Sequence, residues 1–399
     1  MTDPGPHATF FLSEFASTLA RLLHTHEMTP VRWPTVVAAP VVEGCKMDRF
    51  RFQANPPAAR RMIAFFPTYA RRTPGGWQAT VAGMVCRPLP ERSRRRKLAL
   101  AVFKRLLDLE EADLATEVFR RRAESFLFQR VAGQRVQLLL GDRSLEAGPS
   151  DRSGHFKARF EVEDRFVETH ANRSDAESCP WLSYTVIPEE DEPAEPAGPG
   201  RIQLVAETGL SVISDIDDTV KVSNVADRRE LLKNTMLREF VAVPGMPEAY
   251  RRWERAGVAF HYVSSSPWQL SNCLCSFLGA AGLPAGSMHL KLFRLKDSTP
   301  LGRLANRKRS KRRAIEQIMA DFPGRRFVLV GDSGEKDPEV YAAVARRRPD
   351  QVAAVLIRRV PARTAANHAS LRFDKLARRL PTGALQTFTV AEELAALPG

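Results

Sequence analysis

Three short apolar runs, each followed at once by polar residues, constrain the fold of this chain most. The runs cover residues 210–214, 260–263 and 326–330. Continuous apolar runs of this length are typical of strands buried on both faces, as in a parallel sheet covered by helices. The runs lead into Asp215, Ser264 and, after one glycine, Asp332. The pattern predicts an α/β sheet with a ligand site at the carboxyl edge of its strands.

The residues after the first run carry the most chemical information. Asp215 and Asp217 are two positions apart where a strand gives way to a loop. Two such carboxylates can hold a hard divalent cation, and one can attack an electrophile while the other handles protons. A solvated acidic turn explains the pair alone equally well. Thr219 is expected to orient the turn through its hydroxyl, although it and Asp218 could also be only turn formers.

Two further charged positions fall in the order that such a site requires. Lys311 begins a predicted helix whose apolar residues recur at helical spacing, and Asp337 lies five residues beyond Asp332. Lys308 is an alternative to Lys311 if the helix begins one turn away. Asp337 precedes Pro338 and could instead cap a helix.

Together these segments resemble a known family. A nucleophile strand, a hydroxyl strand, a lysine at a helix start and an acidic strand end form the four-part pattern of the haloacid dehalogenase superfamily. Residues 214–221, 263–270 and 331–341 are similar to the phosphatidate phosphatases of the actin-patch-protein type. This resemblance covers roughly residues 200–360. It implies a Rossmann-like catalytic domain, with a parallel sheet, flanking helices and a small cap. It also implies a Mg²⁺-dependent phosphatase that converts phosphatidate, or a related lipid phosphate, to diacylglycerol and phosphate.

The resemblance also implies catalytic roles. Asp215 would attack phosphorus and form an aspartyl-phosphate. Asp217 would act as general acid and then as general base, a task suited to a carboxyl with a raised pKa. Ser264, Ser265 and neighbouring amides would bind the phosphoryl oxygens, and Lys311 would neutralise their charge.

Mg²⁺ is the expected cofactor. The resemblance places it on the carboxylates of Asp215 and Asp332 and on the backbone carbonyl of Asp217, with Asp337 supporting the site from further out. In the serine segment, Ser265 and Ser266 could instead only complete a turn before Pro267. Trp268 is expected to be a packing anchor.

The chain divides into four predicted segments. Residues 1–29 form an amphipathic helix, and residues 30–187 form a β-rich domain, a sandwich or barrel, with a helical insertion at about 91–130. A hairpin is expected from Met62 to Phe66, a turn at residues 74–76, and then Trp77 to Val85. Residues 188–200 read as an acidic, proline-rich linker, and residues 201–399 as the catalytic domain. Residues 220–243 would be its small cap.

Charge indicates an anionic partner. Lys and Arg number 60 against 46 Asp and Glu, which gives a net charge of +14. Residues 291–313 hold ten basic residues and one acidic residue. We expect this stretch, or the N-terminal helix, to bind an anionic phospholipid surface. Nucleic acid is disfavoured but left open, because a basic stretch also suits it and no recognised nucleic-acid module accompanies it.

Two alternatives to a lipid phosphatase remain. One is a phosphatase of the same fold acting on a nucleic-acid end, a phosphoprotein or a soluble phosphate ester. The other is a non-catalytic lipid-binding adaptor. Five cysteines without metal-binding spacing indicate a reducing compartment. No run of 18 apolar residues occurs, so no transmembrane segment is expected. The predicted location is cytoplasmic and peripheral to a membrane.

Overall fold

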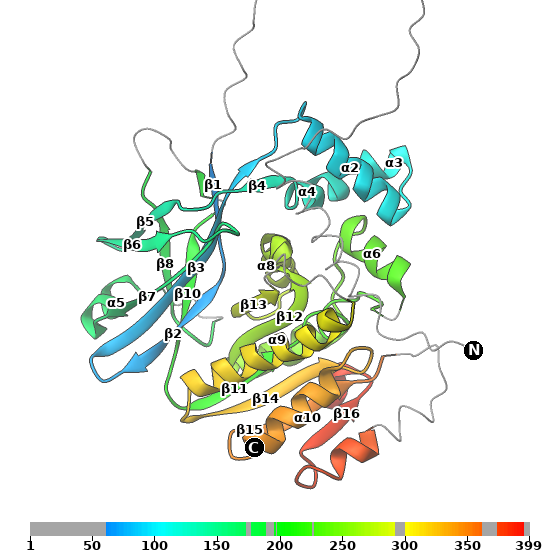
Figure 1. Ribbon diagram of the computed structural model, residues 1–399. Coiled ribbons are helices and arrows are strands. Elements are labelled where there is room, and N and C mark those ends of the chain that lie inside the picture. The colour runs from blue at the N-terminus through cyan, green and yellow to red at the C-terminus, as the bar shows by residue number, and fades with distance from the viewer. Residues whose placement is uncertain are drawn as a thin grey trace, which may run out of the picture.

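The structure, a computed structural model, describes residues 61–172, 177–188, 195–196, 198–225, 227–291, 300–360 and 373–394. The predicted N-terminal helix lies outside the described residues. So do most of the expected linker and part of the basic stretch at 291–313. Within the described part, the chain is a mixed α/β protein with two sheets, one parallel and one largely antiparallel (Figure 1).

The parallel sheet has six strands. They are β11 (Gly209–Ser214), β12 (Ala259–Pro267), β13 (Ser287–Lys291), β14 (Arg325–Asp332), β15 (Val352–Arg358) and β16 (Leu385–Phe388). Their order across the sheet is β13-β12-β11-β14-β15-β16, and every neighbouring pair is parallel. This confirms the predicted parallel sheet, and the three apolar runs are β11, β12 and β14.

Helices cover both faces of this sheet, which explains the apolar runs in its central strands β11, β12 and β14. They are α7 (Met246–Arg255), α8 (Ser271–Ala280), α9 (Pro300–Asp321) and α10 (Asp337–Arg347). Val212 of β11 lies in one buried core with Tyr250 of α7, whereas the next residue, Ile213, lies in another with Ile315 of α9. Successive strand residues point to opposite faces, so both faces need apolar side chains.

The strand order creates a ligand-binding edge. From β11 the chain continues through β12 to β13 on one side, and then crosses to β14 and continues through β15 to β16 on the other. The direction of succession therefore reverses between β11 and β14. In open α/β sheets, ligands bind beyond the carboxyl ends of the strands at this reversal. Asp215 and Asp332 lie at the ends of the two strands involved.

The other sheet, called the first sheet because its strands come first in the chain, has ten strands. They are β1 (Met62–Phe65), β2 (Thr68–Thr73), β3 (Gly76–Pro88), β4 (Phe128–Arg130), β5 (Arg135–Leu140), β6 (Arg143–Pro149), β7 (His155–Val162), β8 (Trp181–Val186), β9 (Glu195–Pro196) and β10 (Gly200–Val205). Their main path is β6-β5-β8-β10-β2-β3-β1-β9, with β4 and β7 also paired to β3. The expected sandwich or barrel is thus one connected sheet around a shared core.

The predicted hairpin is right in its turn and wrong in its first strand. β2, rather than the segment from Met62, leads into the turn and pairs with the start of β3, while β1 pairs with the far end of β3. The apolar pattern could not separate two short strands that share one long partner. Gly76 is required at the turn: its φ is +137°, and a Cβ there would lie 2.4 Å from the Val162 carbonyl oxygen.

Helices interrupt this sheet where the insertion was expected. α2 (Arg94–Leu107), α3 (Glu111–Leu114) and α4 (Glu117–Glu124) separate β3 from β4, and α5 (Asp164–His170) follows β7. β10 follows the expected linker but pairs with β8 and β2. The first sheet therefore extends to Val205, beyond the boundary expected from composition. Proline and glutamate around residue 190 could not reveal this later strand pairing.

The two sheets pack against each other through β2 and β13. The Tyr69 hydroxyl donates a hydrogen bond of 2.6 Å to Asp321 Oδ2, and its ring contacts His261, His289 and Phe322. The Met288 N–H donates to the Pro67 carbonyl over 2.9 Å. Tyr69 is buried in the core of α9 and α10, so the sheets share apolar packing as well as hydrogen bonds.

Two other expectations can be compared with the described residues. Of the helices described, none is long and apolar enough to cross a bilayer. The cysteines described, Cys86, Cys179, Cys273 and Cys275, are all free.

Candidate active site

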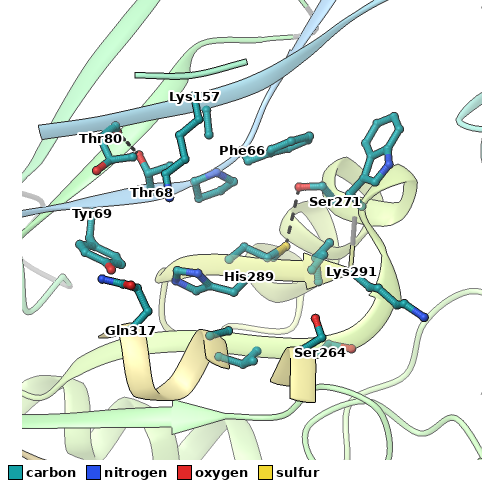
Figure 2. A pocket seen from close by; sticks show the side chains of 18 of the residues that line it. Phe66, Thr68, Tyr69, Thr80, Lys157, Ser264, Ser271, His289, Lys291 and Gln317 are labelled. Carbon is teal, nitrogen blue, oxygen red and sulfur yellow. Dashed lines mark hydrogen bonds between the residues drawn. The ribbon is translucent and has the colours of Figure 1, made fainter. Parts of the chain in front are cut away.

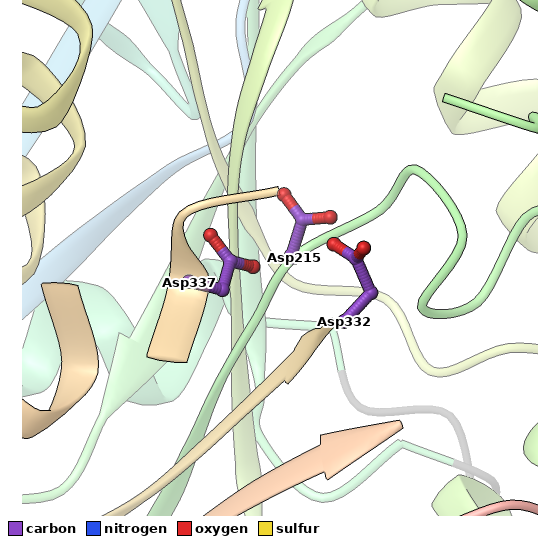
Figure 3. A group of neighbouring side chains, drawn as sticks. All are labelled: Asp215, Asp332 and Asp337. Atoms are coloured by element: carbon purple, nitrogen blue, oxygen red, sulfur yellow. The ribbon is translucent and has the colours of Figure 1, made fainter. Parts of the chain in front are cut away.

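Three buried carboxylates meet at the carboxyl edge of the parallel sheet. Asp215 follows β11, Asp332 ends β14, and Asp337 is the first residue of α10. One oxygen of each lies within 4.8 Å of the others (Figure 3). Asp337 begins the helix, whereas Lys336 occupies the cap position, so the helix-cap alternative for Asp337 is wrong. Its carboxylate belongs to the same cluster as the two strand-end acids.

A glycine makes this approach possible. A Cβ at Gly331 would lie 2.4 Å from Asp337 Oδ2 and 2.7 Å from the ring of Tyr341. Real Cβ atoms do not approach other atoms so closely, so a larger residue would displace α10 from the end of β14. The Gly331-Asp332 pair therefore gives both an acid and the space for a second acid.

Lys311 joins two of the three acids. Its Nζ donates to Asp215 Oδ1 over 2.7 Å and to Asp337 Oδ1 over 2.5 Å, and all three side chains are buried. These contacts favour Lys311 as the lysine of the site; the side chain of Lys308 lies outside the described residues. If all three carboxylates are ionised, the single ammonium of Lys311 neutralises one of their charges. The two remaining negative charges equal the charge that a divalent cation would neutralise.

The oxygens not used by Lys311 suit such a cation. Asp332 Oδ1 accepts hydrogen bonds from the Gly334 and Glu335 N–H groups over 2.6 and 3.1 Å. Asp332 Oδ2 and Asp337 Oδ2 are buried and have no hydrogen-bond partner among the described residues. A buried carboxylate oxygen without a donor is costly. Since Mg²⁺ prefers oxygen ligands, the residues present fit this ion.

The electrostatics of this cluster support the same interpretation. Burial raises the pKa of Asp215 well above its ordinary value, which Lys311 only partly offsets. Burial, and then the neighbouring Asp337 and Glu335, raises the pKa of Asp332. Burial alone would lower the pKa of Lys311, but Asp215 and Asp337 outweigh it and raise the pKa. The ammonium is therefore retained, while the surplus of carboxylates lacks a positive partner.

Asp217 lies in a second, separately balanced cluster. Its Oδ1 is 2.8 Å from Lys221 Nζ and accepts from the Ser223 hydroxyl over 2.7 Å. Its Oδ2 accepts from the Ser266 hydroxyl over 2.7 Å and from the Ser264 hydroxyl over 3.2 Å. Burial would raise the pKa of Asp217, but Lys221 and the serine hydroxyls outweigh burial and lower it to about 2. The expected raised pKa is wrong, because Lys221 stabilises the ionised carboxylate and no local sequence pattern pairs these two residues.

The turn between the two clusters is held by Asp218. It adopts a positive φ of 53°, and its carboxylate accepts hydrogen bonds from the N–H groups of Ser223, Asn224 and Val225 over 2.6–2.8 Å. Asp218 is thus a turn former, as one alternative expected. Thr219 Oγ1 lies 3.4 Å from Asp215 Oδ2, so its hydroxyl orients the carboxylate weakly.

The serine segment differs from the expected strand and turn. β12 continues to Pro267, so Ser264 and Ser266 are two positions apart on a strand and point the same way. Both reach Asp217, and Ser266 makes the shorter contact. Ser266 is therefore a candidate site residue that the turn interpretation missed. Its position two residues after Ser264 could have indicated that both side chains point to the same face of a strand. Ser265 lies beside a cavity next to the site. Trp268 is buried against Phe66, Phe128 and His155, which confirms it as a packing anchor.

Lys221 and Ser223 are the other site residues that were missed. Lys221 follows Asp217 by four positions, a spacing that carries no weight outside a helix. The structure shows why they meet: Lys221 forms an isolated bridge with Asp217 and another with Ala242, which folds the start of residues 220–243 back over the acid.

The segment 220–243 is also tied to the helical insertion of the first sheet. It contains α6 (Arg228–Met236), which packs beside α2 and α4 (Figure 1). Arg122 of α4 is buried, donates to the Thr235 carbonyl, and lies 3.5 Å above the ring of Phe240. Arg121 pairs with Glu239 over 2.7 Å. The segment over the site therefore rests on helices from the other half of the chain.

The site residues fall within one region of similarity to known proteins. Residues 210–359 match the family model described as the catalytic domain of phosphatidate phosphatase APP1. Phosphatidate phosphatase APP1 of Saccharomyces cerevisiae is 32% identical over 254 residues, covering 61% of this chain and 40% of the relative. An uncharacterized protein of Schizosaccharomyces pombe is 32% identical over 164 residues, covering 40% of this chain and 27% of the relative.

This chain spans less than half the length of these relatives. A solved carbohydrate esterase aligns at 12% identity, covering 80% of this chain and 95% of that chain, with a TM-score of 0.22, which is too low to support an inference about the fold. The matched region is similar to the catalytic domain of a phosphatase, and it spans nearly all of β11 through β15 and holds both acid clusters.

Proposed function

We propose that this chain is a Mg²⁺-dependent phosphatidate phosphatase with a Rossmann-like catalytic domain of the haloacid dehalogenase type. One observation carries the proposal: Lys311 binds Asp215 and Asp337 beside Asp332, where the strand order reverses. The similarity of residues 210–359 to a phosphatidate phosphatase catalytic domain supports the choice of substrate.

The metal would be held by Asp215 and Asp332, with Asp337 beside them. Asp332 Oδ2 and Asp337 Oδ2 are buried and have no donor in the part of the chain that the structure describes, which supports this ligand set. The backbone carbonyl of Asp217 stays a predicted ligand. When bound, Mg²⁺ would supply positive charge to the carboxylates and to the phosphoryl oxygens. Lys311 already holds Asp215 in one orientation, which prepares the carboxylate for attack.

The first step is the transfer of the phosphoryl group to the protein. A carboxylate oxygen of Asp215 forms a bond to phosphorus, while the bond from phosphorus to the diacylglycerol oxygen breaks. That oxygen takes a proton from the protonated Asp217 carboxyl and leaves as an alcohol. Lys221 and the serines favour the ionised form of Asp217, so it must gain a proton before this step.

The second step releases phosphate. A water oxygen attacks phosphorus and gives a proton to the carboxylate of Asp217, while the bond between phosphorus and Asp215 breaks. The described contacts of Asp217 suit this base step directly, because they favour the ionised carboxylate that accepts the proton. Ser264 and Ser266 orient that carboxylate. Asp217 then carries the proton needed for the next substrate.

A comparison of substrates tests the proposed function. Phosphate release would be measured with and without Mg²⁺ from phosphatidate in mixed micelles, from a phosphorylated oligonucleotide and from a soluble aryl phosphate. We expect Mg²⁺-dependent release that is fastest from phosphatidate. Preference for the oligonucleotide would replace the lipid with a nucleic-acid substrate, and no release from any of the three would indicate a non-catalytic protein.

A further inference from the structure

A cavity of about 300 Å³ lies between the two sheets and reaches the candidate active site. Ser264 and Lys311 both line it. Each is one hydrogen bond from a proposed catalytic acid, since Ser264 contacts Asp217 and Lys311 contacts Asp215. A group that fills the cavity therefore lies next to the position of the reacting phosphate.

One wall of the cavity comes from the first sheet, as Figure 2 shows. Thr80 and Ala82 of β3 lie opposite Arg159 and Lys157 of β7 in the antiparallel register. Directly opposed residues share a face of a sheet, so these four side chains form one surface toward the cavity. Phe66 adds an aromatic ring between β1 and β2.

The other wall comes from β12, β13 and α9, so the cavity exists only where the two halves meet. It contains both apolar and polar groups. Val263, Trp268, Met288, Leu290 and Ala314 are among the apolar residues. His289, Gln317 and Lys291 add polar groups on the same side (Figure 2).

This composition points to a ligand segment that is neither purely hydrocarbon nor purely ionic. Apolar side chains would contact methylene groups, while the lysines, threonines and glutamine can donate hydrogen bonds to neutral oxygens. A volume of about 300 Å³ is at the lower end for sites that enclose a small organic ligand. It suits a short segment beside the phosphate rather than two complete acyl chains.

We propose that this cavity binds the part of the substrate next to the phosphate, and that this part is the glycerol-ester segment of a glycerolipid. The proposal rests on the proposed phosphatase function and adds a role for the first sheet. Thr80, Ala82 and Lys157 form a specificity wall, since they contact the ester segment and favour lipid phosphates over phosphate esters that lack one.

A cavity-filling variant tests this role. Ala82→Phe should lower kcat/KM for phosphatidate about tenfold more than kcat/KM for a soluble aryl phosphate, because only the lipid extends past residue 82. Ala112→Trp, on the exposed surface of α3, is the matched control for added volume and should change neither value. Equal loss on both substrates, or no loss on either, would overturn the proposal.

A second variant tests the same wall without adding volume, in case Ala82→Phe does not fold. Lys157 is exposed, so Lys157→Met should leave the fold intact and still shift the ratio of lipid to aryl-phosphate turnover by several-fold. Arg152→Met, at an exposed position outside the cavity lining, controls for lost charge. An unchanged ratio in Lys157→Met would contradict the specificity wall.

A binding measurement distinguishes a failure of this inference from a failure of the proposed function. Calorimetric titration with a short-chain phosphonate analogue of phosphatidate needs no turnover. Weaker binding in Ala82→Phe and Lys157→Met, in a protein that hydrolyses no lipid, would support the cavity and reject the phosphatase. Normal binding in both variants, in a protein that does hydrolyse phosphatidate, would reject the cavity alone.

Discussion

Asp215 and Asp217 are two residues apart, yet their surroundings differ in kind. Asp215 shares a single lysine with Asp337 and lies beside Asp332, and burial raises its pKa. Asp217 pairs with Lys221 and accepts hydrogen bonds from three serine hydroxyls. Lys221, followed by Ser266 and Ser223, outweighs burial and lowers the pKa of Asp217 to about 2. The cluster of Asp215 has more carboxylates than ammonium groups, whereas Asp217 and Lys221 are paired one to one.

This difference shows how one strand end can give two acids different tasks. Neighbouring carboxyl groups with pKa values pushed apart are a sign of separate catalytic roles. The cluster of Asp215 leaves space and charge for a divalent cation, whereas the Asp217 cluster is complete without one. Under the proposed function, the carboxylate of Asp215 would act on phosphorus with the metal, and that of Asp217 would exchange protons.

Removing each acid in turn should have the largest effect. We expect Asp215→Asn and Asp217→Asn each to lower phosphate release from phosphatidate by on the order of 10³-fold or more. They should differ on an aryl phosphate with a good leaving group, where Asp217→Asn retains more activity because departure needs no acid. Steady-state rates on both substrates check this, with exposed Asp350→Asn as control. Equal losses on both substrates would remove the distinction between the acids.

The two lysines offer the next test. Lys221→Met and Lys311→Met each leave buried carboxylates unpaired, which costs about 3–5 kcal/mol of unfolding free energy. We expect Mg²⁺ to restore much of the loss in Lys311→Met, where the cation can replace the ammonium, but little in Lys221→Met. Urea unfolding with and without Mg²⁺ measures both. Equal recovery in the two variants would mean that the clusters do not differ in their need for a cation.

Substitutions in the two clusters should also differ in their effect on the affinity for Mg²⁺. Asp332→Asn and Asp215→Asn are expected to weaken Mg²⁺ binding by about 10–100-fold or more, since each removes a charged ligand. Asp217→Asn keeps its backbone carbonyl and should bind Mg²⁺ nearly as tightly as the unmodified chain. Isothermal titration with Mg²⁺ alone gives these affinities. A comparable loss in Asp217→Asn would place its side chain on the metal.

The serines give the smallest effect. Ser266→Ala removes the shorter hydrogen bond to Asp217 and Ser264→Ala the longer one. A hydrogen bond to a charged group contributes about 1.5–3 kcal/mol, so we expect losses of about tenfold, larger for Ser266→Ala. Rates of phosphate release from phosphatidate provide the measurement. A loss confined to Ser264→Ala would show that the contact of Ser266 with Asp217 has no part in catalysis.

The parallel sheet was predictable because its signal is local. Each of β11, β12 and β14 contains an apolar run that leads to a candidate site residue, and both faces of the sheet are buried under helices. Asp215, Asp332, Asp337 and Lys311 could be brought together from their order in the sequence and from the resemblance of that order to a known family pattern. The contacts of Ser264 and Ser266 with Asp217 agree with their spacing on a strand, but the turn signals of the Ser-Pro segment obscured it.

The rest depends on pairings between distant residues. Lys221 reaches Asp217 only because the segment at Lys221 bridges both Asp217 and Ala242, and no local pattern encodes that fold. β10 joins the first sheet through partners far away in sequence. The cavity between the sheets likewise combines β3 and β7 with α9 and could not be predicted from any one segment.

The most direct test of the central claim is to trap the phosphorylated protein. The chain would be mixed with phosphatidate micelles and Mg²⁺, quenched in acid within one turnover, and digested for peptide mass analysis. We expect one phosphoryl group on the peptide that contains Asp215, and none in Asp215→Asn or without Mg²⁺. Phosphate release without any phosphorylated peptide, or a phosphoryl group on another residue, would contradict Asp215 as the nucleophile.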